Sequence, residues 1–219
     1  EMADYPEHVD ETGCIPKDIM EKLARYQFIS PIIPKEYGGA GAGYVSYAII
    51  MEEISKRCAS TGTFITAGAS LVALPLLNFG TEIQKQKYLK PLASGEKIGC
   101  FGLTEPGAGS DAASGTTTAR WEGDHYVLNG RKCFITNAPI ADFAIISAMT
   151  DRTKGVKGIS VFIVDANTEG WSVGAHENKM GIRGTITSDI VLDNVKVPKE
   201  NLLDVEGKGF KIMMNTLDY

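Results

Sequence analysis

Apolar residues in the first part of the chain recur at the spacing of an α-helix. Ile19, Met20 and Leu23 can share one helical face, and they follow Pro16, whose fixed φ suits the first turn of a helix. Similar spacing returns in later segments of the same part. The pattern predicts helices over residues 18–26, 44–56, 58–81 and 82–89.

The pattern changes to the alternation of β-strands near residue 98. Short apolar or β-branched runs are separated there by turn residues, among them Glu122-Gly-Asp and Asn129-Gly, which is a hairpin signal. Expected strands cover 98–103, 116–121, 126–128, 132–135, 143–149, 159–164, 171–179 and 186–197. Helical spacing returns over 207–217, with Phe210, Met213, Met214 and Leu217 expected on one face.

This order predicts an α+β protein. We expect an N-terminal helical bundle over 1–96 and a small antiparallel β-barrel or sandwich over 97–203. Residues 204–219 would then begin a C-terminal helical domain that the chain truncates.

Two segments admit competing interpretations. Residues 58–81 carry no charge and are long enough to span a bilayer, but hydroxyl, glycine and proline residues interrupt them, so a buried helix of a soluble bundle is favoured. The glycine-rich run 38–43 suggests a phosphate loop, but no Gly-Lys-Ser/Thr follows it. A flexible surface loop is the better prediction.

Composition narrows the function classes. The 219 residues have a net charge of −5, which gives no basic footprint for nucleic acid. The four cysteines and three histidines are scattered, a spacing that favours neither a zinc site nor a disulfide framework. No metal site is therefore predicted. The sequence also shows no recognisable targeting segment.

The stretch 101–111, Phe-Gly-Leu-Thr-Glu-Pro-Gly-Ala-Gly-Ser-Asp, makes unusual demands on the backbone. Pro106 fixes one φ, whereas Gly107 and Gly109 permit positive φ and close approach of a ligand. Freed N–H groups beside the Ser110 hydroxyl would suit a phosphate or pyrophosphate. A strand over 98–103 that ends in an ordinary tight turn is the alternative, and composition alone favours it slightly.

This stretch resembles the signature of the acyl-CoA dehydrogenase family of flavoproteins. A second segment, Lys132-Cys-Phe-Ile-Thr-Asn, is similar to the family's aromatic-Ile-Thr-Asn motif, and Asn194-Val-Lys-Val-Pro-Lys-Glu-Asn is similar to the family's link into its C-terminal helices. The three matches occur in the family's order, and the resemblance runs from about Ile15 to the last residue.

The resemblance implies an FAD site. The backbone at Leu103 and the Thr104 hydroxyl would face the pyrimidine side of the flavin, Thr136 would donate toward N5, and Phe134 would cover a ring edge where many relatives have Trp. Taken singly, each of these is more typical of a strand or core residue. The complete set of implied FAD contacts is Phe101, Leu103, Thr104, Gly109, Ser110, Phe134, Ile135 and Thr136.

The resemblance also implies the α,β-dehydrogenation of a fatty acyl-CoA thioester. Ser110 and Asp218 would contact the acyl-CoA, and Arg183 would shape the β-domain. The family's catalytic glutamate is expected outside this sequence, so no residue here is assigned as the base. The glutamates considered and set aside are Glu52, Glu53, Glu105 and Glu206.

Further expectations follow from the resemblance. The electron acceptor would be an electron-transfer flavoprotein, the full-length protein a homodimer or homotetramer, and the location the bacterial cytoplasm or, after removal of a leader, the mitochondrial matrix. The isolated chain would bind FAD weakly, turn over no substrate and expose an apolar surface. The alternatives are an oxidase, a flavin monooxygenase or an enoyl-CoA reductase on the same scaffold, or a non-catalytic relative that binds FAD or nucleic acid.

Overall fold

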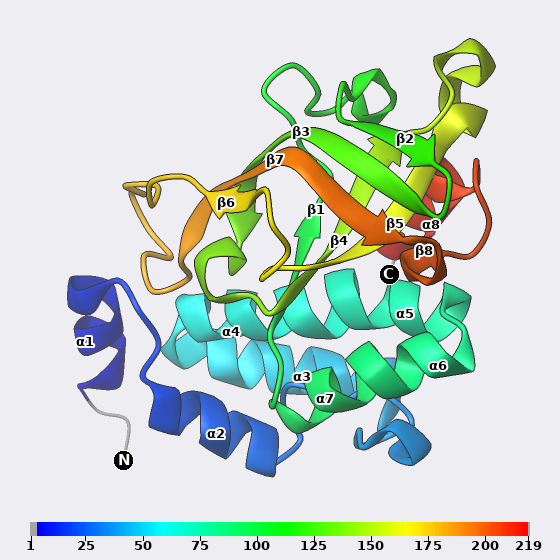
Figure 1. Cartoon of the computed structure of the whole chain (residues 1–219). Helices are drawn as coiled ribbons and strands as arrows, with labels where there is room; N and C mark the ends of the chain where they lie inside the picture. The colour runs from blue at the N-terminus through cyan, green and yellow to red at the C-terminus, as the bar shows by residue number, and fades with distance from the viewer. Residues whose placement is uncertain (1–3, 219) are drawn as a thin grey trace.

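A helical layer and a twisted β-sheet make up the fold in a computed structural model, which describes residues 4–218. The helices before residue 95 lie together below the sheet in Figure 1, and the last helix lies behind it. The predicted α+β class is confirmed. The α-helices are α1 (Tyr5–Thr12), α2 (Lys17–Arg25), α3 (Gly43–Arg57), α4 (Ala59–Thr66), α5 (Ala73–Phe79), α6 (Glu82–Gln84), α7 (Lys90–Ser94) and α8 (Gly209–Leu217).

The four predicted N-terminal helices are present, and α1 is an additional helix that the spacing did not indicate. The glycine-rich run is not a free loop. It is closed onto the preceding residues by backbone hydrogen bonds, including Gly41 N–H to Ile33 O at 2.9 Å and Ala42 N–H to Pro31 O at 2.8 Å. Gly39 lies so close to Ile33 that a Cβ on it would meet the Ile33 carbonyl oxygen. The prediction of a flexible loop did not anticipate this packing.

One helix runs through α4 and α5 and is interrupted by a π-helical segment, η2 (Ala67–Val72). The Ala73 N–H bonds to Gly68 O, five residues back, just before Pro75 removes a donor. A second π segment, η3 (Lys85–Leu89), likewise precedes Pro91 between α6 and α7. The span Ala59–Phe79 is long and apolar enough to cross a membrane, yet 61% of its most apolar window is buried within the described chain.

The sheet has the strand order β6-β7-β3-β2-β4-β5-β8, with β1 paired to β4 outside this path. The strands are β1 (Gly99–Gly102), β2 (Thr118–Glu122), β3 (His125–Thr136), β4 (Phe143–Met149), β5 (Ile159–Asp165), β6 (Trp171–Val173), β7 (Thr187–Pro198) and β8 (Leu202–Leu203). Most pairs are antiparallel, but β1–β4 and β2–β4 are parallel.

The predicted barrel is not formed, because the sheet is not closed. Instead it bends at β2, which meets β4 at the single pair Thr118–Met149. The bend brings Ile146 and Phe162 of one half into a core with Leu128 and Ile190 of the other. The β-domain is therefore one open sheet with a core between its two halves.

Three predictions for the β-domain, two about strands and one about a turn, were wrong in detail. The expected strands 126–128 and 132–135 form the single strand β3, with irregular pairing to β7 near Gly130 and again between Lys132 and Ile135. Asn129-Gly130 is therefore no hairpin turn, and Asn129 instead bonds to Asn194 across the pair. The strand expected over 171–179 ends at Val173.

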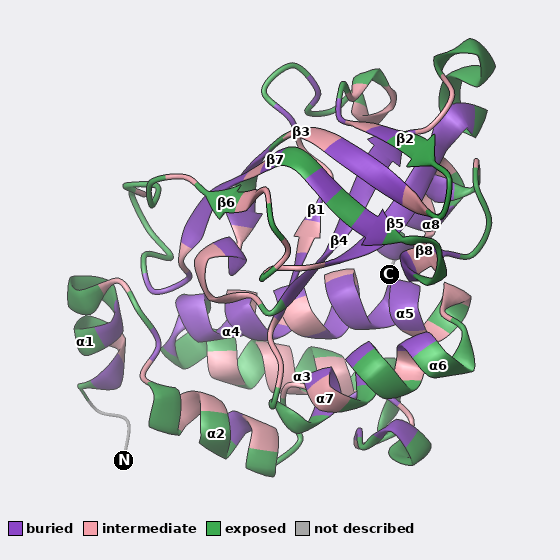
Figure 2. Ribbon diagram, in the orientation of Figure 1, coloured by how far each residue is buried: buried purple, intermediate pink, exposed green. Residues whose placement is uncertain are grey.

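Helix α8 buries a face different from the one expected. Ile212, Met213 and Thr216 are buried, whereas Leu217 is 52% exposed. This face completes a core between the helices and the strands β4, β5 and β8, where Leu76 and Tyr88 meet Phe143. The buried residues of β4, β5 and α5 form a continuous interior in Figure 2.

Candidate functional site

The loop after β1 is anchored by a tight turn. Glu105 and Ala108 exchange two backbone hydrogen bonds of 3.0 Å, which leaves Pro106 and Gly107 exposed at the tip. The two glycines, Gly107 and Gly109, do not have the positive φ that the sequence suggested. A Cβ on either would meet no atom within 4 Å, so the space beside both glycines is open.

A buried ion pair fixes this loop to β3. The Lys132 ammonium lies 2.7 Å from Glu105 Oε1, 3.0 Å from Ser147 Oγ and 3.2 Å from the Leu103 carbonyl oxygen. Its side chain is 1% exposed and that of Glu105 is 2% exposed. The Glu105 carboxylate also accepts hydrogen bonds from Thr116 and Thr117, so every charge in the cluster is paired.

The environment sets the protonation of both groups. Burial raises the pKa of Glu105. The positive charge of Lys132 and the hydrogen bonds from Lys132, Thr117 and Thr116 outweigh this effect and hold that pKa at about 2. Burial lowers the pKa of Lys132, and the Glu105 carboxylate opposes this effect. Glu105 is therefore a firmly ionised structural group rather than a proton acceptor.

The two sequence motifs lie side by side. The Cys133 N–H donates to the Thr104 carbonyl oxygen at 2.9 Å, beside the Lys132 contact with Leu103. Within the described residues, neither the Thr104 nor the Thr136 hydroxyl has a hydrogen-bond partner. Both threonines are half-buried, so the hydroxyls can serve a ligand.

Phe134 interrupts the pairing of β3 with β7. It has φ +59°, in the left-handed region that a bulky residue avoids, and its side chain is 65% exposed. An exposed aromatic in a strained conformation points to a functional constraint rather than to packing. The neighbouring Ile135 side chain is buried in the core between the sheet halves, so only its backbone is available to a ligand.

The remaining implied contacts are distributed unevenly. Phe101 and Leu103 are partly buried against the core between helices and sheet, against which Met214 of α8 also packs. Gly109 and Ser110 are exposed on the loop. Asp218 is exposed just after α8, and among residues 4–218 no hydrogen bond or ion pair connects its side chain with the loop.

Sequence reasoning missed Lys132 as an anchor and Asn137 as an unpaired buried amide. Strand alternation places Arg131 outside and Lys132 inside, which was a usable signal for a buried charge. Asn137 has φ +67° and is 1% exposed, and neither atom of its side-chain amide has a partner.

Comparisons with known proteins agree with the motifs. Residues 1–96 match the acyl-CoA dehydrogenase N-terminal domain, and residues 100–195 match the acyl-CoA dehydrogenase middle domain. A short-chain specific acyl-CoA dehydrogenase of Clostridium acetobutylicum is 50% identical over 218 residues, which is 100% of this chain and 58% of that protein.

Two further proteins extend the comparison. A subunit of the caffeyl-CoA reductase–Etf complex of Acetobacterium woodii is 50% identical over 97% of this chain and 56% of its own length. An acyl-CoA dehydrogenase from Bacillus anthracis, solved in complex with FAD, has a TM-score of 0.90 and 38% identity over 100% of this chain and 37% of its own. The chain thus spans less than two thirds of the length of these curated relatives.

Proposed function

The chain belongs to the acyl-CoA dehydrogenase family, and from that premise we propose that the protein carrying it is an FAD-dependent dehydrogenase of short-chain fatty acyl-CoA thioesters. The observation that carries the proposal is the 2.9 Å hydrogen bond from Cys133 to Thr104, because it brings the two flavin motifs together. The short-chain preference rests on the Clostridium acetobutylicum relative.

The residues of the site fit the cofactor. Two unpaired threonine hydroxyls, an exposed aromatic in a strained conformation and an open glycine loop are what a flavin, its ring edge and its pyrophosphate require. We propose that Thr104 and the Leu103 backbone hold the pyrimidine side, that Thr136 donates toward N5 and that Phe134 covers a ring edge. Gly109 and Ser110 would face the pyrophosphate, while Phe101 and the Ile135 backbone would complete the wall.

The chain's residues prepare the reaction rather than perform every step. When bound, FAD supplies the acceptor for the hydride that leaves the β carbon of the thioester. A carboxylate must take the α proton, and donors to the thioester carbonyl must stabilise the developing enolate. Glu105 cannot be that base, because its pKa of about 2 and its enclosure by Lys132 disfavour proton capture. Ser110 and Asp218, both exposed, are the proposed acyl-CoA contacts.

The proposal extends to partners. We infer an electron-transfer flavoprotein as acceptor, which the Acetobacterium woodii relative supports through its membership of a complex with Etf. A homodimer or homotetramer, located in the bacterial cytoplasm or the mitochondrial matrix, completes the proposal. Sedimentation of the full-length protein, alone and mixed with the flavoprotein, tests assembly and partner together.

A second candidate is the reverse reaction, the reduction of an α,β-unsaturated acyl-CoA. The 50% identity to a protein named as part of a caffeyl-CoA reductase complex favours it. The proposed flavin contacts and the proposed acyl-CoA contacts would hold the same two molecules in both directions, so they are compatible with either.

Anaerobic titration of the full-length, FAD-loaded protein separates these possibilities. Butyryl-CoA should bleach the oxidised flavin band, and a chemically reduced sample should be reoxidised by crotonyl-CoA or caffeyl-CoA if the reductive direction operates. Thr136→Val should weaken FAD binding by about tenfold, because one charge-stabilising hydrogen bond is lost. Thr63→Val, which removes a half-buried hydroxyl bonded to Ala59 O, is the matched control. Failure of the purified protein to bind FAD would overturn the proposal.

A further inference from the structure

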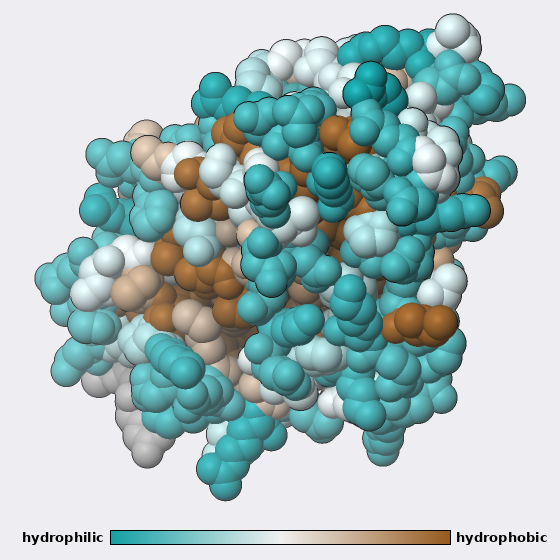
Figure 3. Space-filling view, in the orientation of Figure 1, coloured by the Kyte–Doolittle hydropathy of each residue, from teal (hydrophilic) through white to brown (hydrophobic). Residues whose placement is uncertain are grey.

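A cavity of about 200 Å³ lies between α2, the α4–η2 helix, α7 and the start of β1. Its apolar wall includes Met20, Ile29, Phe64, Leu92 and Ile98. Apolar residues also gather on this face of the molecule over α4, left of centre in Figure 3. We name this space the Asn137 cavity, after the residue that enters it from the sheet side.

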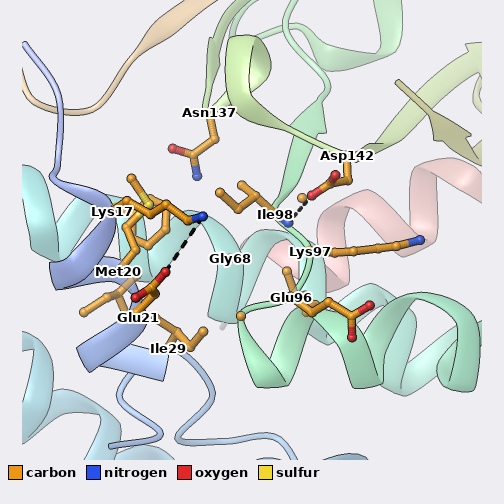
Figure 4. A pocket seen from close by; sticks show the side chains of 15 residues that line it. Lys17, Met20, Glu21, Ile29, Gly68, Glu96, Lys97, Ile98, Asn137 and Asp142 are labelled. Carbon is orange, nitrogen blue, oxygen red and sulfur yellow. Dashed lines mark hydrogen bonds and ion pairs between the residues drawn. The ribbon is translucent and has the colours of Figure 1, made fainter. Parts of the chain in front are cut away.

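Asn137 is the one residue of the cavity wall whose buried side chain lacks hydrogen-bond partners among the described residues. Its backbone is fully engaged: the N–H donates to Ile186 O at 2.8 Å, and the carbonyl oxygen accepts from Ile140 N–H at 3.0 Å. Figure 4 shows its amide directed into the cavity, toward Ile98 and α2. A buried amide with a free donor and a free acceptor is destabilising unless something fills the space beside it.

The cavity is kept open by a glycine. Gly68 lies in the π-helical segment of the wall, and a Cβ there would meet no atom within 4 Å. Almost any other residue would occupy the space. The rim is polar and charged: Lys17 and Glu21 form an exposed ion pair of 3.9 Å, and the Asp142 carboxylate accepts the Ile98 N–H at 2.8 Å.

We propose that the Asn137 cavity binds a small neutral molecule with an apolar body and a single primary amide or hydroxyl group. Such a group offers one donor and one acceptor, the complement of an asparagine amide. A carboxylate offers acceptors only, so it would leave the Asn137 side-chain oxygen without a donor. The lining also carries more acidic residues (Glu21, Glu96 and Asp142) than lysines (Lys17 and Lys97), so an anion is disfavoured. A cavity of about 150 Å³ accepts benzene, so this volume suits a body of about four to six carbons.

Pentanamide and pentanoate are the probes that test this, because they share the same hydrocarbon and differ in charge. In the full-length protein that carries this sequence, calorimetric titration should give a dissociation constant of roughly 1 mM or lower for pentanamide, within the limit for so small a ligand. Pentanoate should bind at least tenfold more weakly. Equal binding of both probes would overturn the proposal.

Two variants locate the binding. Gly68→Leu should fill the cavity and weaken pentanamide binding at least tenfold, and it should fold normally because leucine favours the helix over glycine. Asn137→Asp, which keeps the shape but removes the donor, should weaken it similarly. Lys22→Ala, which breaks an exposed ion pair with Asp18 on the same helix and does not line the cavity, should leave binding within about twofold.

Gly68→Ala provides a smaller filling step should Gly68→Leu prove unstable, and it should give an intermediate loss. Retained affinity in a folded Gly68→Leu protein would place the ligand elsewhere and overturn the proposal. A protein that binds neither probe, with only ordered waters bridging the amide in a crystal structure, would show that water is the occupant and would overturn it as well.

Discussion

Lys132 on β3 and Asn137 just after it are equally buried, each 1% exposed, yet they differ in whether their side-chain polar atoms have hydrogen-bond partners. The Lys132 ammonium has partners in Glu105, Ser147 and the Leu103 carbonyl. The Asn137 amide has none among the described residues. A satisfied buried charge holds the backbone in place, whereas an unsatisfied buried amide marks a place where something else belongs. Burial alone therefore does not separate scaffold from site.

The largest expected effect comes from breaking the satisfied cluster. Lys132→Met should lower the free energy of unfolding by about 3–5 kcal/mol, because it leaves the Glu105 carboxylate buried and unpaired. The double variant Lys132→Met/Glu105→Gln should recover most of that loss. Urea denaturation measures both. Lys154→Met, which breaks an exposed pair with Asp151, is the control and should cost less than about 1 kcal/mol. A loss below that value in Lys132→Met would contradict the comparison.

Acid should weaken the same cluster in a defined window. The folded-state pKa of Glu105 is held at about 2, below its ordinary value of 4.5, so its stabilisation is complete above pH 4.5 and is lost as the pH falls toward 2. The free energy of unfolding, measured from pH 6 downward, should fall less steeply in the Lys132→Met/Glu105→Gln protein. Asp151 also has a pKa lowered to about 2, so both proteins should carry Asp151→Asn. Parallel slopes would show that Glu105 is not the group that titrates.

Phe134 is an intermediate case, because its backbone is strained although its exposed side chain gains little from packing. Phe134→Gly should leave stability unchanged or raise it by up to about 1 kcal/mol, because glycine relieves a left-handed conformation and little buried area is lost. FAD affinity of the full-length protein should fall at least tenfold, as fluorescence titration would detect. Trp121→Gly, at an aromatic that is 43% exposed on β2, should leave FAD affinity unchanged. Normal FAD binding by Phe134→Gly would contradict the prediction that Phe134 adopts its strained conformation in order to contact FAD.

The sequence predicted what periodicity and motifs encode. The helices α2 to α6, the strands β4 and β5 and the order of the two flavin motifs were all accessible, whereas α1 was not. The turn at Asn129-Gly130 was misjudged because its propensity was overridden by pairing with β7 over the whole of β3. The barrel was not formed because closure requires β6 and β8, the two ends of the strand path, to pair, and that pairing depends on packing between distant segments.

The candidate site shows the same division. Thr104, Phe134 and Thr136 were available from the motifs, although their roles stay predictions. The strain at Phe134 and the unpaired amide of Asn137 were not available, because φ and hydrogen-bond satisfaction are properties of the folded chain. Local patterns identify which residues are unusual, and the tertiary structure shows which of them are left unsatisfied.

The smallest expected effect is at Asn137 itself. Asn137→Gly removes no hydrogen bond of the described chain and places glycine where φ is +67°, so only the entropy of a more flexible unfolded chain opposes it, by about 0.5–1 kcal/mol. Removing a buried unpaired amide favours the variant by about 1–3 kcal/mol. Urea denaturation should therefore show a change within about 1 kcal/mol of zero or a gain in stability, against the loss in Lys132→Met. A loss above 2 kcal/mol would mean that the amide is satisfied in solution, and the contrast between the two residues would then be one of partner, protein or water, rather than of scaffold and site.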